Sequence, residues 1–150
     1  MSHHPPSIES VAKALIINEL RQVLVLTVGE YEKHPEKSFK PDLPGGLVDP
    51  GETERDAVIR EIHEEAGITV AAADTHLAYT ETKFYADENK SVSKSLYIVA
   101  LYQTPEVMIS WEHSAYEWIN LDELLQTKTF RPFYAKAIAY SLEHGLIKTK

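Results

Sequence analysis

Runs of apolar residues separated by polar interruptions predict a set of β-strands. Val11–Ile17 and Val23–Val28 are rich in β-branched and aliphatic residues, and Asn18-Glu19 lies between them. Two such runs joined by a short polar connection predict a hairpin. The other predicted strands are His76–Tyr85, Val92–Tyr102 and the short Glu117–Ile119, with a hairpin loop at residues 86–90 joining the first two of these.

The apolar spacing changes to a helical period between Thr53 and Ala66. Thr53 and Asp56 have the spacing of a capping box, and Gly67 follows the segment where a helix would end. The residues predicted to face the core are Val58, Ile59, Ile62 and Ala66.

A second helix is predicted at Arg131–His144. Pro132 lies near its first position and Gly145 directly after it, which is the usual distribution of these two residues around a helix. Its apolar stripe consists of Tyr134, Ile138 and Leu142. A shorter helical turn is predicted at Leu121–Leu125.

The remaining segments are polar or rich in residues that interrupt regular structure. Residues 1–8 predict a loose N-terminal tail, and residues 29–42 predict a loop. Leu43-Pro44-Gly45-Gly46 predicts a tight turn at which the backbone can approach another group closely.

The order of these elements indicates the fold class. Strands and helices are mixed without regular βαβ alternation, and we find no repeat or interdomain linker. This pattern favours an α+β fold, or helices packed around a mixed sheet. A chain of 150 residues is typically one domain, which we place at residues 9–150.

Composition excludes several classes of protein. The chain contains no cysteine, which excludes a disulfide scaffold, a thiolate zinc site and a cysteine nucleophile. The formal net charge of −8 argues against a broad nucleic-acid-binding surface. The longest apolar run, Leu96–Tyr102, is too short to span a membrane, and the N-terminus does not resemble a secretory signal. We therefore expect a cytoplasmic protein.

The acidic residues are concentrated in one segment. From Asp49 to Glu65 there are seven acidic and two basic residues, a net charge of −5. Glu61, Glu64 and Glu65 have helical spacing, which places their Cβ atoms about 5–6 Å apart.

Such a charge run is usually a solvated face. Here it lies at the C-terminal end of its helix, where the helix dipole disfavours negative charge. The nearby glycines offer backbone carbonyls, so the pattern favours a hard cation such as Mg²⁺ or Mn²⁺.

The segment from Gly46 to Ile68 resembles the Nudix box. That motif is Gly, five residues, Glu, seven residues and Arg-Glu-U-x-Glu-Glu-x-Gly-U, in which U is aliphatic. The matching residues are Gly46, Glu52, Arg60, Glu61, Ile62, Glu64, Glu65, Gly67 and Ile68. All nine fixed positions match without a gap, and Leu43-Pro44-Gly45 resembles the usual entry to the box.

The resemblance implies a fold and a chemistry. The fold would be an α/β/α sandwich with a mixed sheet between helices. The activity would be hydrolysis of a nucleoside diphosphate linked to another moiety, with Mg²⁺ or Mn²⁺. Glu61, Glu64 and Glu65 match the carboxylates that bind metal and activate water, and Glu61 combines ligation with a base role. The Gly45 carbonyl matches a backbone ligand, and Arg60 with Glu52 matches an ion pair that orients the carboxylates.

Members of the family usually have a further metal-binding glutamate outside the box. Glu112 is the candidate here, and Glu106 and Glu117 are weaker alternatives. Its neighbour His113 would contact substrate or take part in proton transfer, or is simply a surface loop histidine.

The substrate-binding residues are expected outside the box. The candidates are Phe39 and Lys40 in the 29–42 loop, and Lys83 and Tyr85 in a predicted strand, since aromatic rings stack on bases and lysines contact phosphates. Strand aromatics are, however, more often core residues.

The sequence does not distinguish among several classes of nucleotide substrate. The proline that often marks ADP-ribose hydrolases is absent, and Tyr85 lies near the position of a tyrosine that recurs in dinucleoside polyphosphate hydrolases. The broadest prediction is a nucleoside triphosphate, such as a damaged dNTP. The alternatives are a dinucleoside polyphosphate or a nucleotide sugar. A non-catalytic nucleotide-sensing module is a rival from another class, and a homodimer is possible.

Overall fold

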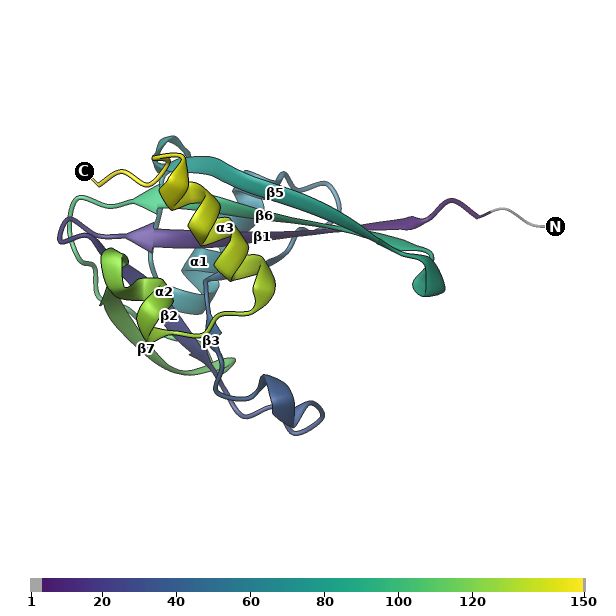
Figure 1. The fold of residues 1–150 in the computed structure, drawn as a ribbon, viewed down its shortest axis with the longest axis horizontal. Coiled ribbons are helices and arrows are strands. Elements are labelled where there is room, and N and C mark those ends of the chain that lie inside the picture. Colours follow the sequence, from purple (N-terminus) through teal and green to yellow (C-terminus); the bar gives the residue numbers. More distant parts are fainter. Residues whose placement is uncertain (1–3, 150) are drawn as a thin grey trace.

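A single mixed sheet forms the centre of the fold in the computed structural model, which describes residues 4–149 (Figure 1). Its seven strands are β1 (Ser7–Ile17), β2 (Gln22–Val28), β3 (Pro41–Asp42), β4 (Gly45–Leu47), β5 (Thr75–Tyr85), β6 (Lys90–Ala100) and β7 (His113–Asn120). The main strand order is β3-β2-β1-β6-β5, with β4 paired to β1 and β7 paired to β2. The β1–β6 pair is parallel and every other pair is antiparallel.

Helices cover both faces of this sheet. The α-helices are α1 (Glu54–Ala66), α2 (Leu124–Thr127) and α3 (Pro132–Glu143), and the short 3₁₀ segments are η1 (Pro35–Lys37), η2 (Ala72–Asp74), η3 (Ala86–Glu88) and η4 (Leu121–Glu123). Figure 1 shows α3 in front of the sheet and α1 behind it. The predicted α/β/α sandwich is therefore confirmed.

Successive side chains of β1 point to opposite faces of the sheet and contribute to a separate core on each face. Leu15 and Ile17 pack in the cluster that includes α2 and α3, whereas Ala14 and Ile16 pack in the cluster that includes α1. Side chains of successive strand residues point to opposite faces, so one apolar run can supply two cores. The continuous apolar character of this run reflects burial on both faces.

The predicted hairpin between the first two strands is only partly correct. β1 and β2 pair antiparallel at Ile17 and Val23, next to the turn. Beyond that point β1 pairs in parallel with β6 over its whole length, and β2 pairs with β7. The turn residues indicate only the local connection, because the longer ladders join strands that are distant in sequence.

The two long helices agree with their sequence signals. The Thr53 hydroxyl accepts a hydrogen bond from the Asp56 N–H at 3.1 Å, and Gly67 ends α1 with φ of 69°. Pro132 begins α3, and Gly145 follows its end with φ of 63°.

The predicted tight turn at residues 43–46 is wrong. Gly45–Leu47 forms strand β4, which pairs with β1. The expected close approach of backbone is present, because a Cβ at Gly45 would lie 2.6 Å from the Cα of Lys13. Gly45 also has φ of 138°, a conformation that favours glycine.

The predicted N-terminal tail is shorter than expected. Residues 1–3 lie outside the described residues, and β1 begins at Ser7, so residues 7 and 8 belong to the sheet. No helix within residues 4–149 is long and apolar enough to cross a membrane.

Candidate active site

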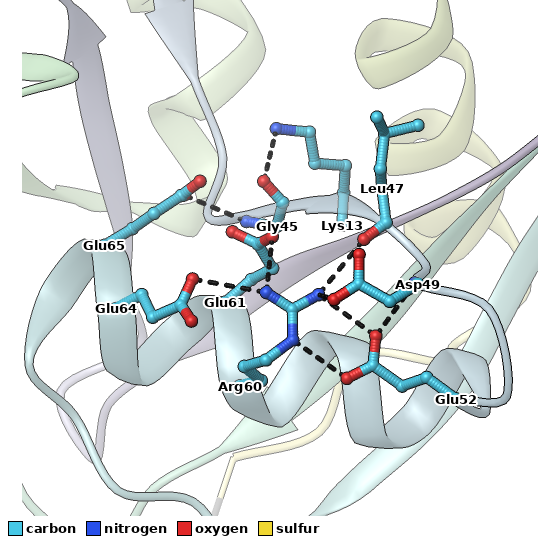
Figure 2. Close-up of polar contacts among 9 residues, drawn as sticks. All are labelled: Lys13, Gly45, Leu47, Asp49, Glu52, Arg60, Glu61, Glu64 and Glu65. Carbon is cyan, nitrogen blue, oxygen red and sulfur yellow. Dashed lines mark hydrogen bonds and ion pairs between the residues drawn. The ribbon is translucent and has the colours of Figure 1, made fainter.

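The guanidinium of Arg60 contacts several acidic side chains on and before α1. Arg60 lies at the centre of Figure 2, and its Nη2 also donates to the Leu47 carbonyl at 3.2 Å. Its ionic partners are Glu52 at 2.8 Å, Glu61 at 3.0 Å, Glu64 at 3.2 Å and Asp49 at 3.5 Å. The contact of Arg60 with Glu52 that the resemblance implied is present, and Glu64 lies one helical turn beyond Arg60.

Arg60 and Glu52 each shift the pKa of the other. Hydrogen bonding to Arg60 lowers the pKa of Glu52, and the bond from the Asp49 N–H lowers it further. Hydrogen bonding to Glu52 raises the pKa of the Arg60 guanidinium, which burial opposes only partly. One cation thus offsets the repulsion among several carboxylates that would otherwise disfavour the helix.

Glu65 faces inward. It is 4% exposed and lies on the buried side of α1 with Val58 and Ile62, not on a common solvent face with Glu61 and Glu64. One of its oxygens accepts a hydrogen bond from the Gly45 N–H at 3.1 Å. Burial raises the pKa of Glu65 to about 8, while Lys13 and the Gly45 N–H act in the opposite direction.

Gly46 leaves room for the carboxylate of Glu61. A Cβ at Gly46 would lie 2.9 Å from Oε1 of Glu61, so any larger residue would displace that carboxylate. Glu61 and Glu65 therefore approach the Gly45-Gly46 segment from the same helix (Figure 2).

Lys13 of β1 approaches the same segment from the sheet. Its ammonium donates to the carbonyls of Leu43 and Gly45, both at 3.1 Å, and to Asp42 Oδ1 at 3.3 Å. Burial alone would lower the pKa of Lys13, but the charges of Tyr134, Asp42 and Glu65 raise it above its ordinary value.

Asp42 is the buried centre of a second network. It accepts from the Tyr134 hydroxyl at 2.6 Å and from Arg131 at 3.4 Å, and its other oxygen lies 2.9 Å from His113 Nε2. Burial alone would raise the pKa of Asp42, but Lys13, His113 and Tyr134 lower it. The network joins β1, β3, β7 and α3 behind the Gly45 carbonyl.

A cavity of about 660 Å³ opens beside Gly46 and Lys13. Its cationic lining residues are Lys13, Lys83, Lys94, Arg131 and Lys136, and its acidic ones are Glu9 and Glu81. Tyr85, Phe133 and Tyr134 add aromatic rings. Five cations against two acids make this cavity basic in a chain of net charge −8.

Comparison with known proteins identifies the family. The NUDIX domain matches residues 9–140. The chain belongs to the NUDIX domain family.

Several relatives of this NUDIX domain have names that describe nucleotide hydrolysis. The asymmetrical bis(5'-nucleosyl)-tetraphosphatase of Caenorhabditis elegans is 37% identical over 83 residues, which are 55% of this chain and 60% of that protein. The nucleoside triphosphatase NudI of Escherichia coli O1:K1 / APEC is 34% identical over 89 residues, which are 55% of this chain and 63% of that protein. Each match thus spans less than two thirds of the relative's length.

A solved structure agrees with the fold of this NUDIX domain over nearly its full length. The MutT protein from Methanosarcina mazei Go1 superimposes with a TM-score of 0.75 at 28% identity. The superposition covers 95% of this chain and 99% of that one.

The carboxylate oxygens of α1 and the Gly45 carbonyl oxygen are the kind of ligand that a hard divalent cation prefers. Nudix hydrolases generally use such a cation. The Gly45 N–H contacts Glu65, a carboxyl group whose pKa is raised chiefly by burial, so that a bound cation would stabilise its ionised form. Within residues 4–149, however, no three acidic or histidine side chains form a finished ligand set. Glu61 and Glu64 contact Arg60, so a bound cation would have to draw them from it.

The candidate outer ligand lies in a loop next to α1. The Ser110 N–H donates to the Glu65 backbone carbonyl at 3.2 Å, and the Glu112 N–H donates to the Ser110 hydroxyl at 3.4 Å. Glu112 is exposed in the turn directly before β7, and its role as a ligand stays a prediction. The alternative Glu117 forms an ion pair with Lys128.

The structure changes the interpretation of His113. Its side chain is only 3% exposed, so it is not a surface loop histidine. Nε2 contacts Asp42, and Nδ1 is buried without a hydrogen-bond partner among residues 4–149. It lies against Asp42, and its predicted contact with substrate or role in proton transfer stays a prediction.

The predicted substrate-binding residues separate into two groups. Lys83 and Tyr85 line the basic cavity, and the Lys83 ammonium lies 5.0 Å from the centre of the Tyr85 ring. Phe39 lines a different cavity of about 470 Å³ in the 29–40 loop, and Lys40 lies exposed next to it. Only the first group shares a cavity with Gly46 and Lys13.

Lys13 and Asp42 were not among the predicted site residues. The signal for Lys13 was a single charged residue within the apolar run Val11–Ile17. A buried lysine needs a partner, but Asp42 lies 29 positions away in sequence and only the β1–β4 pairing brings it close.

Proposed function

We propose that this NUDIX domain is a divalent-cation-dependent pyrophosphohydrolase of nucleotides. The observation that carries the proposal is the Gly45-Gly46 segment. Glu61 and Glu65 approach it from α1, and its Gly46 lines a basic, aromatic-lined cavity together with Lys13. Anionic phosphates suit the lysines of the cavity, and the carboxylates suit a cation that the phosphates share.

In the proposed reaction, water attacks phosphorus and forms a new P–O bond as the P–O bond of the anhydride bridge breaks. The bridging oxygen leaves with the second product as a phosphate. A bound divalent cation would make the attacking water more acidic and offset the charge of the phosphates. Glu61 or Glu64 accepts the proton that the water loses.

Arg60 has a positioning role in this proposal. Its contacts with Glu52 and the Leu47 carbonyl fix the guanidinium, which then holds Glu61 and Glu64 at 3.0 and 3.2 Å. The carboxylates are thus kept in place at the C-terminal half of α1 before substrate arrives.

The first substrate candidate is a dinucleoside polyphosphate. Five cations in a cavity of about 660 Å³ suit a ligand with several phosphates, and the Caenorhabditis elegans relative is named as a tetraphosphatase of this class. A nucleoside triphosphate is the second candidate, favoured by the similarity to NudI.

The test is a substrate panel assayed with Mg²⁺. It compares a dinucleoside tetraphosphate, nucleoside triphosphates including an oxidised dGTP, and a nucleotide sugar, with products separated by chromatography. We expect the wild-type protein to cleave the tetraphosphate fastest and Glu64→Gln/Glu65→Gln to cleave none. Glu36→Gln, on the exposed η1 segment, is the matched control and should behave as wild type.

The panel also separates the rival functions. Faster cleavage of triphosphates would select the second candidate. Tight nucleotide binding without cleavage of any compound would contradict the enzymatic proposal and favour a nucleotide-sensing module.

A further inference from the structure

The ammonium of Lys13 lies against the carbonyl that the proposed metal would use. Its Nζ donates to the Gly45 oxygen at 3.1 Å, while the N–H of the same glycine donates to Glu65. Both contacts are drawn in Figure 2. Both polar groups of Gly45 are thus already engaged. A cation bound at this carbonyl would meet a positive charge that belongs to the protein.

The ammonium is held firmly in this position. The carbonyls of Leu43 and Gly45 and the carboxylate of Asp42 accept its three hydrogens, and the side chain is 13% exposed. A buried ammonium keeps its charge only where such acceptors surround it.

Asp42 is itself held by three further side chains, from β7 and from the N-terminal end of α3. Tyr134, His113 and Arg131 surround its two oxygens. Lys13 therefore cannot turn away without leaving a buried carboxylate partly uncompensated, which is costly.

From this arrangement we propose that Lys13 is a tethered cation that competes with the divalent metal at the Gly45 carbonyl and keeps metal binding weak until a phosphate substrate arrives. The inference rests on the proposed metal-dependent function. An octahedral Mg²⁺ lies about 2.1 Å from its oxygen ligands. With the ammonium 3.1 Å from the same oxygen, the two cations are separated by about 5 Å.

The repulsion at this separation is large enough to measure. Even with the full screening of water, a single and a double charge about 5 Å apart change a binding constant by about tenfold or more. Bound phosphates would offset both charges, so the competition ends when substrate occupies the adjoining cavity. Lys13 lines that cavity as well.

The experiment measures Mn²⁺ binding directly, by electron paramagnetic resonance of the free ion and by calorimetry, without substrate. Lys13→Met removes the ammonium and keeps an unbranched apolar side chain. We expect it to bind Mn²⁺ about tenfold or more tightly than wild type. Lys94→Met makes the same change of net charge in the same cavity, away from Gly45, and should bind Mn²⁺ as wild type does.

A double variant separates the local effect from net charge and from folding. Lys13→Met/Asp42→Asn removes the pair together, leaves the net charge unchanged and leaves no buried carboxylate without its lysine. We expect it to be folded by circular dichroism and also to bind Mn²⁺ more tightly than wild type.

The outcomes distinguish this inference from the proposed function. Absence of specific Mn²⁺ binding in wild type and in both Lys13 variants would contradict the metal-dependent function itself. Binding in wild type with an unchanged constant in the Lys13 variants would overturn the inference alone, as would equal tightening in Lys94→Met. Loss of folding in both Lys13 variants would assign Lys13 to stability and overturn it too.

Discussion

Replacement of Glu65 by glutamine should make the metal-free protein more stable, and by an amount that grows with pH. Glutamine keeps an oxygen that can accept the Gly45 N–H but carries no charge into the buried site. Burial raises the pKa of Glu65 from 4.5 to about 8. At neutral pH the folded protein therefore holds a proton there that the unfolded chain has released.

The sign of the pH dependence follows from this difference in proton binding. Below the unfolded pKa, both states are protonated and Glu65 contributes no difference. Between the two pKa values the unfolded state is ionised while the folded state is not, so the wild-type protein loses stability as pH rises. Above the folded pKa both states are ionised and the penalty is constant.

The magnitude follows from the size of the shift. Each pKa unit corresponds to about 1.4 kcal/mol. Between about pH 5 and about pH 7, the wild type should therefore lose on the order of 2–3 kcal/mol relative to Glu65→Gln. In a domain of this size that difference corresponds to a relative change in Tm of about 5–10 °C.

The assay is thermal unfolding of both proteins in EDTA across this pH range. The comparison isolates Glu65 because every other titrating group is shared. A difference in Tm that stays constant with pH would refute the assignment of Glu65 as a buried, neutral acid in the metal-free protein. Added Mg²⁺ should stabilise the wild type most at the alkaline end, because metal binding there displaces fewer protons.

Three further experiments test separate parts of the site. Arg60→Lys should lower the catalytic rate about 10–100-fold in a steady-state assay, because an ammonium cannot hold several carboxylates as a guanidinium does; retained activity would contradict the positioning role. Gly46→Ala should lower activity while changing stability in urea unfolding by less than about 1 kcal/mol, because its Cβ displaces only the carboxylate end of Glu61; unchanged activity would contradict a role for the position of Glu61. Lys83→Ala should raise KM about tenfold while Lys40→Ala leaves it unchanged, and equal effects would argue against the basic cavity as the substrate site.

Local signals account for the parts of the fold that the sequence predicts well. Thr53 and Gly67 mark the two ends of α1 because capping depends on residues within one turn. The parallel pairing of β1 with β6 joins residues more than 80 positions apart, and no turn residue reports it. The predicted hairpin therefore extended too far along β1.

The candidate site likewise has features that the sequence indicated and features that only the tertiary structure shows. The Arg60 contacts lie within one motif, and the resemblance to the Nudix box implied the pair with Glu52. Glu65 is buried because of the way in which α1 packs on the sheet. His113 points inward because it contacts Asp42, which lies 71 positions away in the sequence. These features need the tertiary structure because burial is decided by neighbouring elements and not by helical phase alone.

The contacts of Arg60 have a consequence for the life of the protein in a cell. Arg60 offsets the negative charge of Glu61 and Glu64 on α1, and apolar side chains form a core on each face of the sheet. If the protein uses a divalent cation as proposed, its folding would then not depend on that ion. Scarcity of the metal would lower activity without unfolding the protein, and resupply would restore activity without new synthesis.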